Sequence, residues 1–192
     1  MSKYPKYVEV NGRKYNINTD FRVAIRCNQI ATDENIGDVE RALGVICTLF
    51  GEDSINYQDD YEPLLKLAKK YLSCGKELDN ASDGEVDMDY IQDMDYIEAS
   101  FMSDYGIDLS TTDMHWYKFS NLINGLSNSE FGNCCVLNRI RNIRNFNLND
   151  ISDPKERDKM LKMKNQFALK KTKKITEEQK ESVDEFYKAL GF

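Results

Sequence analysis

The side chains that most often perform chemistry are sparse in this chain and form no recognisable constellation. His115 is the only histidine, and it is followed by Trp116, the only tryptophan. A structural zinc site needs four ligands, and neither a second histidine nor a cysteine lies at ligand spacing from His115. A catalytic or metal-binding role for His115 is therefore the minor alternative. Packing of this pair in a helical core is the interpretation that the sequence favours.

The cysteines are odd in number and include no Cys-x-x-Cys pair. They are Cys27, Cys47, Cys74, Cys134 and Cys135. This pattern argues against a disulfide framework and against a zinc ribbon, so we expect reduced thiols. Cys27 and Cys47 lie on apolar helical stripes and are expected to be small core residues, while a redox role for the adjacent Cys134 and Cys135 is the minor alternative.

Carboxylates gather in one stretch of the chain. Between Glu77 and Asp95 there are eight carboxylates and no base. An EF-hand alignment of this stretch fails, because it places Ala81 at a ligand position and Tyr90 where a bidentate Glu is required. Residues 76–89 are therefore predicted to be a solvated acidic loop, with docking of a basic partner as the alternative.

Composition excludes several classes of function. The net charge of −7 repels a nucleic-acid backbone, and the chain contains no phosphate-binding loop and no Gly-x-Ser-x-Gly motif. No apolar run reaches the length of a membrane span, and the N-terminus lacks the apolar segment of a secretion signal. We expect a cytoplasmic protein that is not an enzyme, carries no cofactor or metal, and binds neither nucleic acid nor membrane.

The elements that position these residues begin with a β-hairpin. Asn11-Gly12 supplies two residues suited to positive φ and predicts a two-residue type I′ turn. The register then places an apolar set on one face, consisting of Val8, Val10, Tyr15 and Ile17. Packing of this face within the chain is favoured over pairing with a strand of a partner.

Helices are predicted for most of the remaining chain, because apolar residues recur at three- and four-residue spacing. The expected ranges are about 20–33, 38–50, 61–74, 96–105, 111–126, 131–146, 152–171 and 176–190. Gly106 is expected to end the fourth helix with positive φ. The fold class is therefore mainly α: a multi-helix domain over 1–150 with a small N-terminal hairpin, followed by a basic helical C-terminal extension over 151–192.

Several side-chain orientations follow from the same patterns. Val39 is expected in the core of the second helix, and Thr111, Thr112 and Asp113 are the candidate caps of the helix that contains Trp116. On the helix over 131–146, three arginines are expected to face outward, where they are solvated or pair with the acidic stretch rather than meet phosphates. They are Arg139, Arg141 and Arg144.

Residues 96–126 contain three short motifs in series. They are Tyr-Ile-x-Ala-Ser-Phe from Tyr96, Tyr-Gly-Ile-Asp-Leu from Tyr105, and His-Trp-x-Lys-Phe-x-x-Leu-x-x-Gly-Leu from His115. Together with Ile17-Asn-Thr-Asp-Phe-Arg22, they resemble the signature of the phage "gene product fifteen" family, which is encoded among the tail genes of siphophages and prophages. The resemblance spans roughly residues 7–144, and Tyr117 departs from it, since the family often repeats Trp there. The motif residues expected to be structural are Tyr96, Phe101, Tyr105, Gly106, His115, Trp116, Phe119 and Gly125.

The resemblance implies a tail assembly chaperone that acts in the host cytoplasm and binds the tape-measure protein. The tail tube protein and a second copy of the chain are the further candidate partners. A minor structural component of the tail is the alternative. Between Lys155 and Lys174 there are nine bases and two acids, together with a Met and Phe stripe suited to adaptable helix-in-groove contacts. The partner-binding residues are predicted to be Lys159, Met160, Met163, Lys164, Phe167, Lys170 and Lys171.

Overall fold

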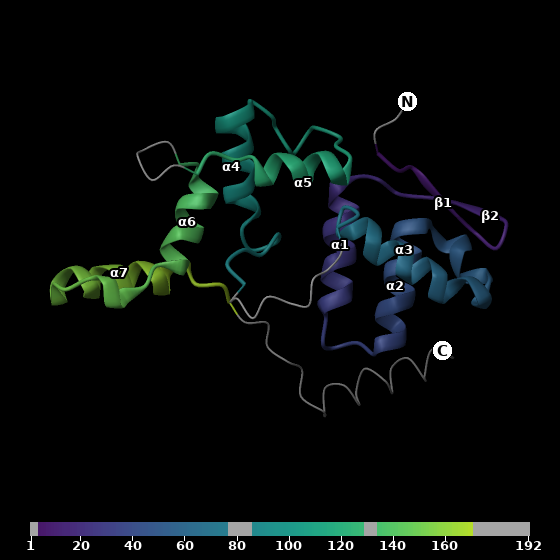
Figure 1. Cartoon of the computed structure of the whole chain (residues 1–192), viewed down its shortest axis with the longest axis horizontal. Helices are drawn as coiled ribbons and strands as arrows, with labels where there is room; N and C mark the ends of the chain where they lie inside the picture. The colour runs from purple at the N-terminus through teal and green to yellow at the C-terminus, as the bar shows by residue number, and fades with distance from the viewer. Residues whose placement is uncertain (1–3, 77–85, 129–133, 171–192) are drawn as a thin grey trace.

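An N-terminal hairpin and seven α-helices make up the described part of the chain (Figure 1). The computed structural model describes residues 4–76, 86–128 and 134–170. The elements are β1 (Tyr7–Val10), β2 (Arg13–Asn16), α1 (Phe21–Thr32), α2 (Asp38–Phe50), η1 (Glu52–Asn56), η2 (Gln58–Asp60), α3 (Tyr61–Leu72), α4 (Met94–Tyr105), α5 (Trp116–Asn124), α6 (Val136–Asn145), η3 (Leu148–Asp150) and α7 (Pro154–Phe167).

The predicted fold class is confirmed: the protein is mainly helical, with a two-stranded N-terminal hairpin and a helix in the C-terminal region. The helix expected over 176–190 lies outside the described residues. The division into 1–150 and 151–192 stays a prediction.

The hairpin has the register that its turn residues predict. Val8 pairs with Tyr15, Glu9 with Lys14, and Val10 with Arg13. Asn11 and Gly12 both have positive φ, at 49° and 77°, as a type I′ turn requires. The side chains of Val10, Tyr15 and Ile17 are buried, so the apolar face packs within the chain.

Asp60 fastens this hairpin to the start of α3. Its carboxylate is fully buried and accepts hydrogen bonds from Asn11 Nδ2 at 2.6 Å, Arg13 Nη1 at 3.0 Å and the hydroxyl of Tyr15. The hydrogen bond from Tyr15, with those from Asn11 and Arg13, holds the pKa of Asp60 below its ordinary value although burial opposes ionisation. The Arg13 guanidinium also lies over the ring of Tyr57, at 4.0 Å from its centroid.

Helices α1 and α2 pack closely, and the residues of α2 at the contact differ in part from those predicted. Val45 and Leu49 are buried, whereas Val39 is 67% exposed. The expectation that Val39 belongs to the core is therefore wrong. Val39 lies in the first turn of α2, after the 33–37 connection, where none of the described elements buries it. Farther along, Gly44 meets Ile30, whose Cγ2 would stand only 3.0 Å from an added Cβ.

The core between these helices and α4–α5 is built around Phe119. Its ring stacks on Phe21 at 4.5 Å, on Phe101 at 5.3 Å and on Trp116 at 5.8 Å between centroids. All four side chains are buried, which confirms the predicted burial of Trp116. The indole Nε1–H donates to the carbonyl oxygen of Leu72 at 3.0 Å, so the polar atom of Trp116 is satisfied and α5 is tied to α3.

Helices α1 and α5 begin at a shared junction. The backbone N–H of Phe21 donates to Met114 O at 2.9 Å, and that of Trp116 donates to Thr19 O at 2.8 Å. His115 caps α5, since its Nδ1 accepts from the backbone N–H of Tyr117 at 3.0 Å. Its Nε2 lies 3.0 Å from Pro5 O, and because a carbonyl can only accept, this nitrogen carries the proton.

The caps predicted for α5 are therefore wrong. Thr111, Thr112 and Asp113 lie before the helix, in the segment that carries the chain to its junction with α1. The reason is tertiary: Leu109 and Met114 are buried in this segment, and the helix can begin only after Met114 has paired with Phe21.

Two glycines of the motif region have specific geometric tasks. Gly106 ends α4 with φ of 66°, as predicted. Gly125 lies against the side chain of Tyr105, and a Cβ there would stand 3.0 Å from the Tyr105 hydroxyl oxygen. That hydroxyl donates to Leu122 O at 2.8 Å, so Gly125 leaves the space in which α4 and α5 are linked.

Truncation of the central tryptophan should be severely destabilising. Trp116→Ala removes a buried ring and leaves the Leu72 carbonyl without its donor, so the free energy of unfolding should fall by about 3 to 5 kcal/mol. Met102→Ala, at a half-exposed position on α4, is the control and should change stability by less than about 1 kcal/mol. Urea unfolding measures both variants, and similar losses in the free energy of unfolding would contradict the assigned core.

The hairpin anchor should produce a defined pH dependence. Because the folded-state pKa of Asp60 is depressed, its contribution is fully present above the unfolded pKa of about 3.9 and is lost as pH falls through the folded value. Asp60→Asn should therefore be less stable than the unmodified protein at pH 7, and the difference should shrink below about pH 4. Urea unfolding at a series of pH values measures it, and a pH-independent difference would contradict the assigned ion pair.

Candidate interaction surface on the C-terminal arm

The C-terminal arm, defined as residues 146–170, projects from the body of the protein (Figure 1). Its helix α7 packs against α6 and η3. Although α7 is described over its whole length, it contains no buried residue. Leu161 and Met163 are 43% and 38% exposed. Helix α7 of the arm therefore leaves two of its large apolar side chains, Leu161 and Met163, exposed.

Local sequence accounts for the start of α7. Asp153 caps it by accepting from the backbone N–H groups of Lys155 and Glu156, and Pro154 occupies the first turn. Asp158 and Lys162 form an ion pair at i, i+4. The helix ends at Phe167 rather than near Lys171, because Ala168 is extended.

The structure divides the predicted partner-binding residues between two sides of the arm. Met160, Lys164 and Phe167 are half-buried on the side that docks on the body. The Lys164 ammonium donates to Phe146 O at 2.6 Å, and the Phe167 ring meets Tyr96 edge-on at 6.5 Å. Lys159, Met163 and Lys170 are exposed, and Lys171 lies outside the described residues. Lys159 and Met163 are thus the predicted residues on α7 that remain fully available to a partner.

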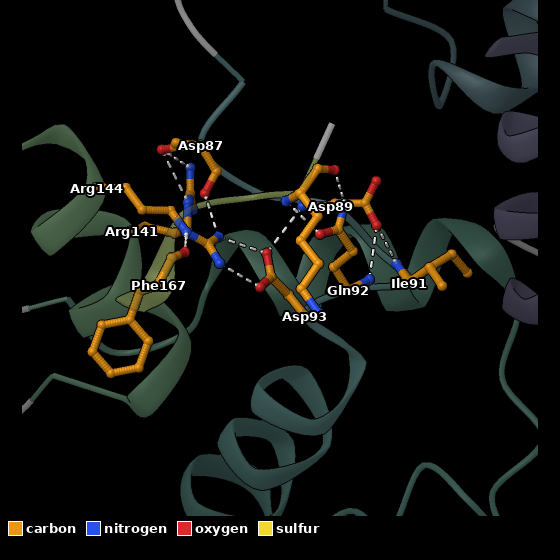
Figure 2. Close-up of polar contacts among 9 residues, drawn as sticks. Asp87, Asp89, Ile91, Gln92, Asp93, Arg141, Arg144 and Phe167 are labelled. Atoms are coloured by element: carbon orange, nitrogen blue, oxygen red, sulfur yellow. Dashed lines mark hydrogen bonds and ion pairs between the residues drawn. The ribbon is translucent and has the colours of Figure 1, made fainter. Parts of the chain in front are cut away.

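A buried arginine fixes the end of the arm (Figure 2). Arg144 of α6 forms a two-pronged ion pair with Asp93, with both N–O distances at 2.7 Å. Its Nε donates to Phe167 O at 2.6 Å, and its Nη1 also donates to Asp87 O at 2.8 Å. The side chains of Arg144 and Asp93 are only 10% and 1% exposed. One side chain therefore joins α6, the 87–93 segment and the end of α7.

This arrangement overturns the expectation that Arg144 faces outward. The hydrogen bonds to Asp93 raise the pKa of the Arg144 guanidinium, since they favour its charged form over the cost of burial. Asp93 also accepts from the backbone N–H of Asp89 at 3.0 Å. Both charges of the buried pair are therefore satisfied by several partners, as a desolvated pair requires.

Further polar contacts hold the same region. Arg141, which is 36% exposed, pairs with Asp87, and Asn145 Nδ2 donates to the same carboxylate at 2.8 Å. Burial opposes ionisation of Asp87, but these hydrogen bonds outweigh it and hold its pKa below the ordinary value. The side-chain amide of Gln92 both accepts from Lys170 N at 2.8 Å and donates to Lys170 O at 3.1 Å.

These contacts correct the prediction for the acidic stretch. Asp87, which lies in the predicted loop, is not solvated but binds Arg141 of α6, and Asp93, just beyond the loop, binds Arg144. This is the pairing with the acidic stretch that the sequence left open for these arginines. Residues 77–85 of that stretch lie outside the described residues.

Sequence reasoning missed Asp93 and Asp60, although a signal for both exists. Asp93 precedes Ile97 and Phe101 at four-residue spacing, in register with the buried stripe of α4. Asp60 stands in the same relation to Leu64 and to the rest of the buried stripe of α3. A carboxylate in register with an apolar stripe must be buried, and a buried carboxylate needs a partner.

The described residues contain no geometry for catalysis or metal binding that we recognise. In the ranges 4–76, 86–128 and 134–170, no three His, Cys, Asp or Glu residues are placed to hold a metal ion. An open hollow between α4, α5 and α6 contains Cys134 and Asp104, but Asp104 already accepts from Ser127 N at 2.8 Å. Burial raises the pKa of the Cys134 thiol, which is the opposite of what a nucleophile needs.

Of the helices described, none is both long enough and apolar enough to cross a bilayer. In comparisons with known proteins, a family model described as Bacteriophage Gp15 protein matches residues 1–169. The matched range includes α7 and every segment joined by Arg144. Comparison with curated proteins and with solved structures gave no match.

Removal of the buried cation should loosen the arm. Arg144→Gln leaves Asp93 buried without its countercharge, so the free energy of unfolding should fall by about 3 to 5 kcal/mol. Hydrogen exchange should quicken at the backbone amides of residues 87–93 and 168–170. Arg139→Gln, at an exposed position on the same helix, is the control and should leave both readouts nearly unchanged. Equal exchange in the two variants would contradict the anchoring role of Arg144.

Proposed function

This chain belongs to the bacteriophage Gp15 protein family, and from that premise we propose that it is a non-enzymatic tail assembly chaperone which binds the tape-measure protein in the host cytoplasm. Membership favours a role in phage structure or morphogenesis. The finer assignment, to capture of the tape-measure protein, is supported by the chemistry of the arm.

The observation that carries the proposal is an exposed helix held rigidly at its end. Helix α7 has no buried residue, yet Arg144 and Gln92 bind the backbone of Phe167 and Lys170. A helix that contributes so little to the core is ordered at a cost in conformational entropy, which a binding role would explain. Pre-ordering lowers the entropy that must be lost when a partner binds.

The side chains of α7 fit a helical partner. Leu161 and Met163 offer exposed apolar contact, and methionine adapts its shape to irregular surfaces. Lysines on the same helix add long-range attraction for acidic groups. The tape-measure protein is expected to be a long helical chain that must be kept from aggregating until tube subunits cover it. We expect such a chain to present mixed apolar and acidic faces.

Co-expression with the tape-measure protein tests the proposal. The two proteins should co-purify, and the double variant Lys159→Glu, Met163→Glu should reduce recovery of the tape-measure protein by about tenfold or more, since it removes one charge contact and one apolar contact. Both side chains are exposed, so the variant should keep the melting temperature of the unmodified protein. Truncation of the arm is a poorer test, because it also removes the Phe167 carbonyl that Arg144 binds.

The matched control places the same substitutions elsewhere. Lys69→Glu, Met102→Glu changes an exposed lysine of α3 and a half-exposed methionine of α4, and it should leave capture unchanged. Equal loss in both variants would remove the arm from the proposal. Recovery of the protein in purified virions by mass spectrometry would instead support a minor structural component of the tail.

A further inference from the structure

One face of α7 carries three lysines, two of which form no ion pair with the described residues. Lys155, Lys159 and Lys162 recur at i, i+4 and i+7, which places them on one side of the helix, and all three are exposed. Lys162 is paired with Asp158, whereas Lys155 and Lys159 form no ion pair with any residue that the structure describes. Met163, 38% exposed, borders this face. We define Lys155, Lys159, Lys162 and Met163 as the lysine face.

A surface of complementary character lies in the connection between α2 and α3. Glu52, Asp53 and Asp59 are exposed there and form no ion pair with the described residues. No Lys or Arg occurs in the sequence between Arg41 and Lys66. Two large apolar side chains of the same connection, Ile55 and Tyr57, are 40% and 45% exposed. We define Glu52, Asp53, Ile55, Tyr57 and Asp59 as the acidic patch.

A cation beside the acidic patch is already engaged. Arg13 lies over the Tyr57 ring, but its guanidinium is bound to the buried carboxylate of Asp60. Among the described residues, the negative charge of the patch is therefore not compensated by an ion pair, and it lies beside apolar side chains. This is the inverse of the lysine face, where uncompensated positive charge lies beside Met163.

The two surfaces cannot meet within one chain as it is folded. Helix α7 lies at one end of the molecule, and α2, α3 and the hairpin lie at the other (Figure 1). Helix α7 packs mainly against α6 and η3, and Phe167 at its end meets Tyr96 of α4. A contact between the lysine face and the acidic patch must therefore join two copies.

We propose that the lysine face of one copy docks on the acidic patch of a second copy of this chain. Opposite charges steer the two surfaces together, and the exposed apolar side chains of each supply contact area that excludes water. Because the two surfaces differ, two copies can form a dimer with two such contacts, or many copies can join head-to-tail.

This association also regulates the arm, and that consequence rests on the proposed function. Lys159 and Met163 belong both to the lysine face and to the surface assigned to the tape-measure protein. A second copy would therefore cover the capture surface until a partner displaces it. Self-association itself is independent of the capture proposal, because it is measured with no partner present.

Sedimentation velocity of the whole chain provides the test. The unmodified protein should associate as its concentration rises, and added salt should weaken association because exposed charges are screened. Two charge-reversal variants should each weaken association by about tenfold or more. The patch variant carries Glu52→Lys, Asp53→Lys and Asp59→Lys. The face variant carries Lys155→Glu, Lys159→Glu and Lys162→Glu. An equimolar mixture of the two variants should restore association, since each reversed surface then meets its complement.

The matched control reverses three exposed acids away from the patch, Glu40→Lys, Asp95→Lys and Asp113→Lys, with the same change of net charge, and should associate like the unmodified protein. An unmodified protein that stays monomeric at every concentration overturns the proposal and leaves the capture experiment unaffected. Equal weakening in the control, or failure of the mixed variants to associate, also overturns it. If the unmodified protein self-associates but does not bind the tape-measure protein in the capture assay, the proposed function is rejected instead.

Discussion

The position of the arm depends on one buried ion pair, between Arg144 and Asp93. Taking both charges out of water is costly, and the pair is stabilising only because every nearby polar group is aimed at it. Asp93 receives two guanidinium nitrogens and a backbone N–H, while Arg144 also reaches the carbonyl oxygens of Asp87 and Phe167. Such a network has one geometry that satisfies it, whereas apolar contacts tolerate sliding. This explains how α7 is placed without burying any of its own residues.

The opposite end of the molecule uses the same physical device. Asp60 and Asp93 each stand at the N-cap of a helix, where the helix dipole favours a negative charge. Neither carboxylate caps its own helix. Asp60 instead gathers donors from the hairpin, and Asp93 gathers donors from α6. Between these polar anchors, the stack of rings around Phe119 supplies the apolar core. The two surfaces to which we assign interactions are thus each held by a buried carboxylate.

The motifs by which the chain resembles its family lie in the core and its connections rather than on the arm. Phe101, Trp116 and Phe119 are core residues, and Gly125 leaves space for the hydroxyl of Tyr105. His115 caps α5 and binds the N-terminal segment through Pro5. These roles are structural and involve no ligand. The proposed capture surface lies outside the motif region, on residues whose types could vary with the partner.

The sequence by itself determined the features whose interactions are local. The hairpin register follows from Asn11-Gly12, the start of α7 from Asp153 and Pro154, and the end of α4 from Gly106, because each depends on hydrogen bonds within a few residues. Only the tertiary structure decided which charges are buried and which apolar residues are not. Arg144 pairs with Asp93 at a separation of 51 residues along the chain, and Tyr15 donates to Asp60 at a separation of 45 residues. Helical periodicity assigns a side chain to a face but contains no information on what lies opposite, so Arg144 was expected to face outward and Val39 to lie in the core.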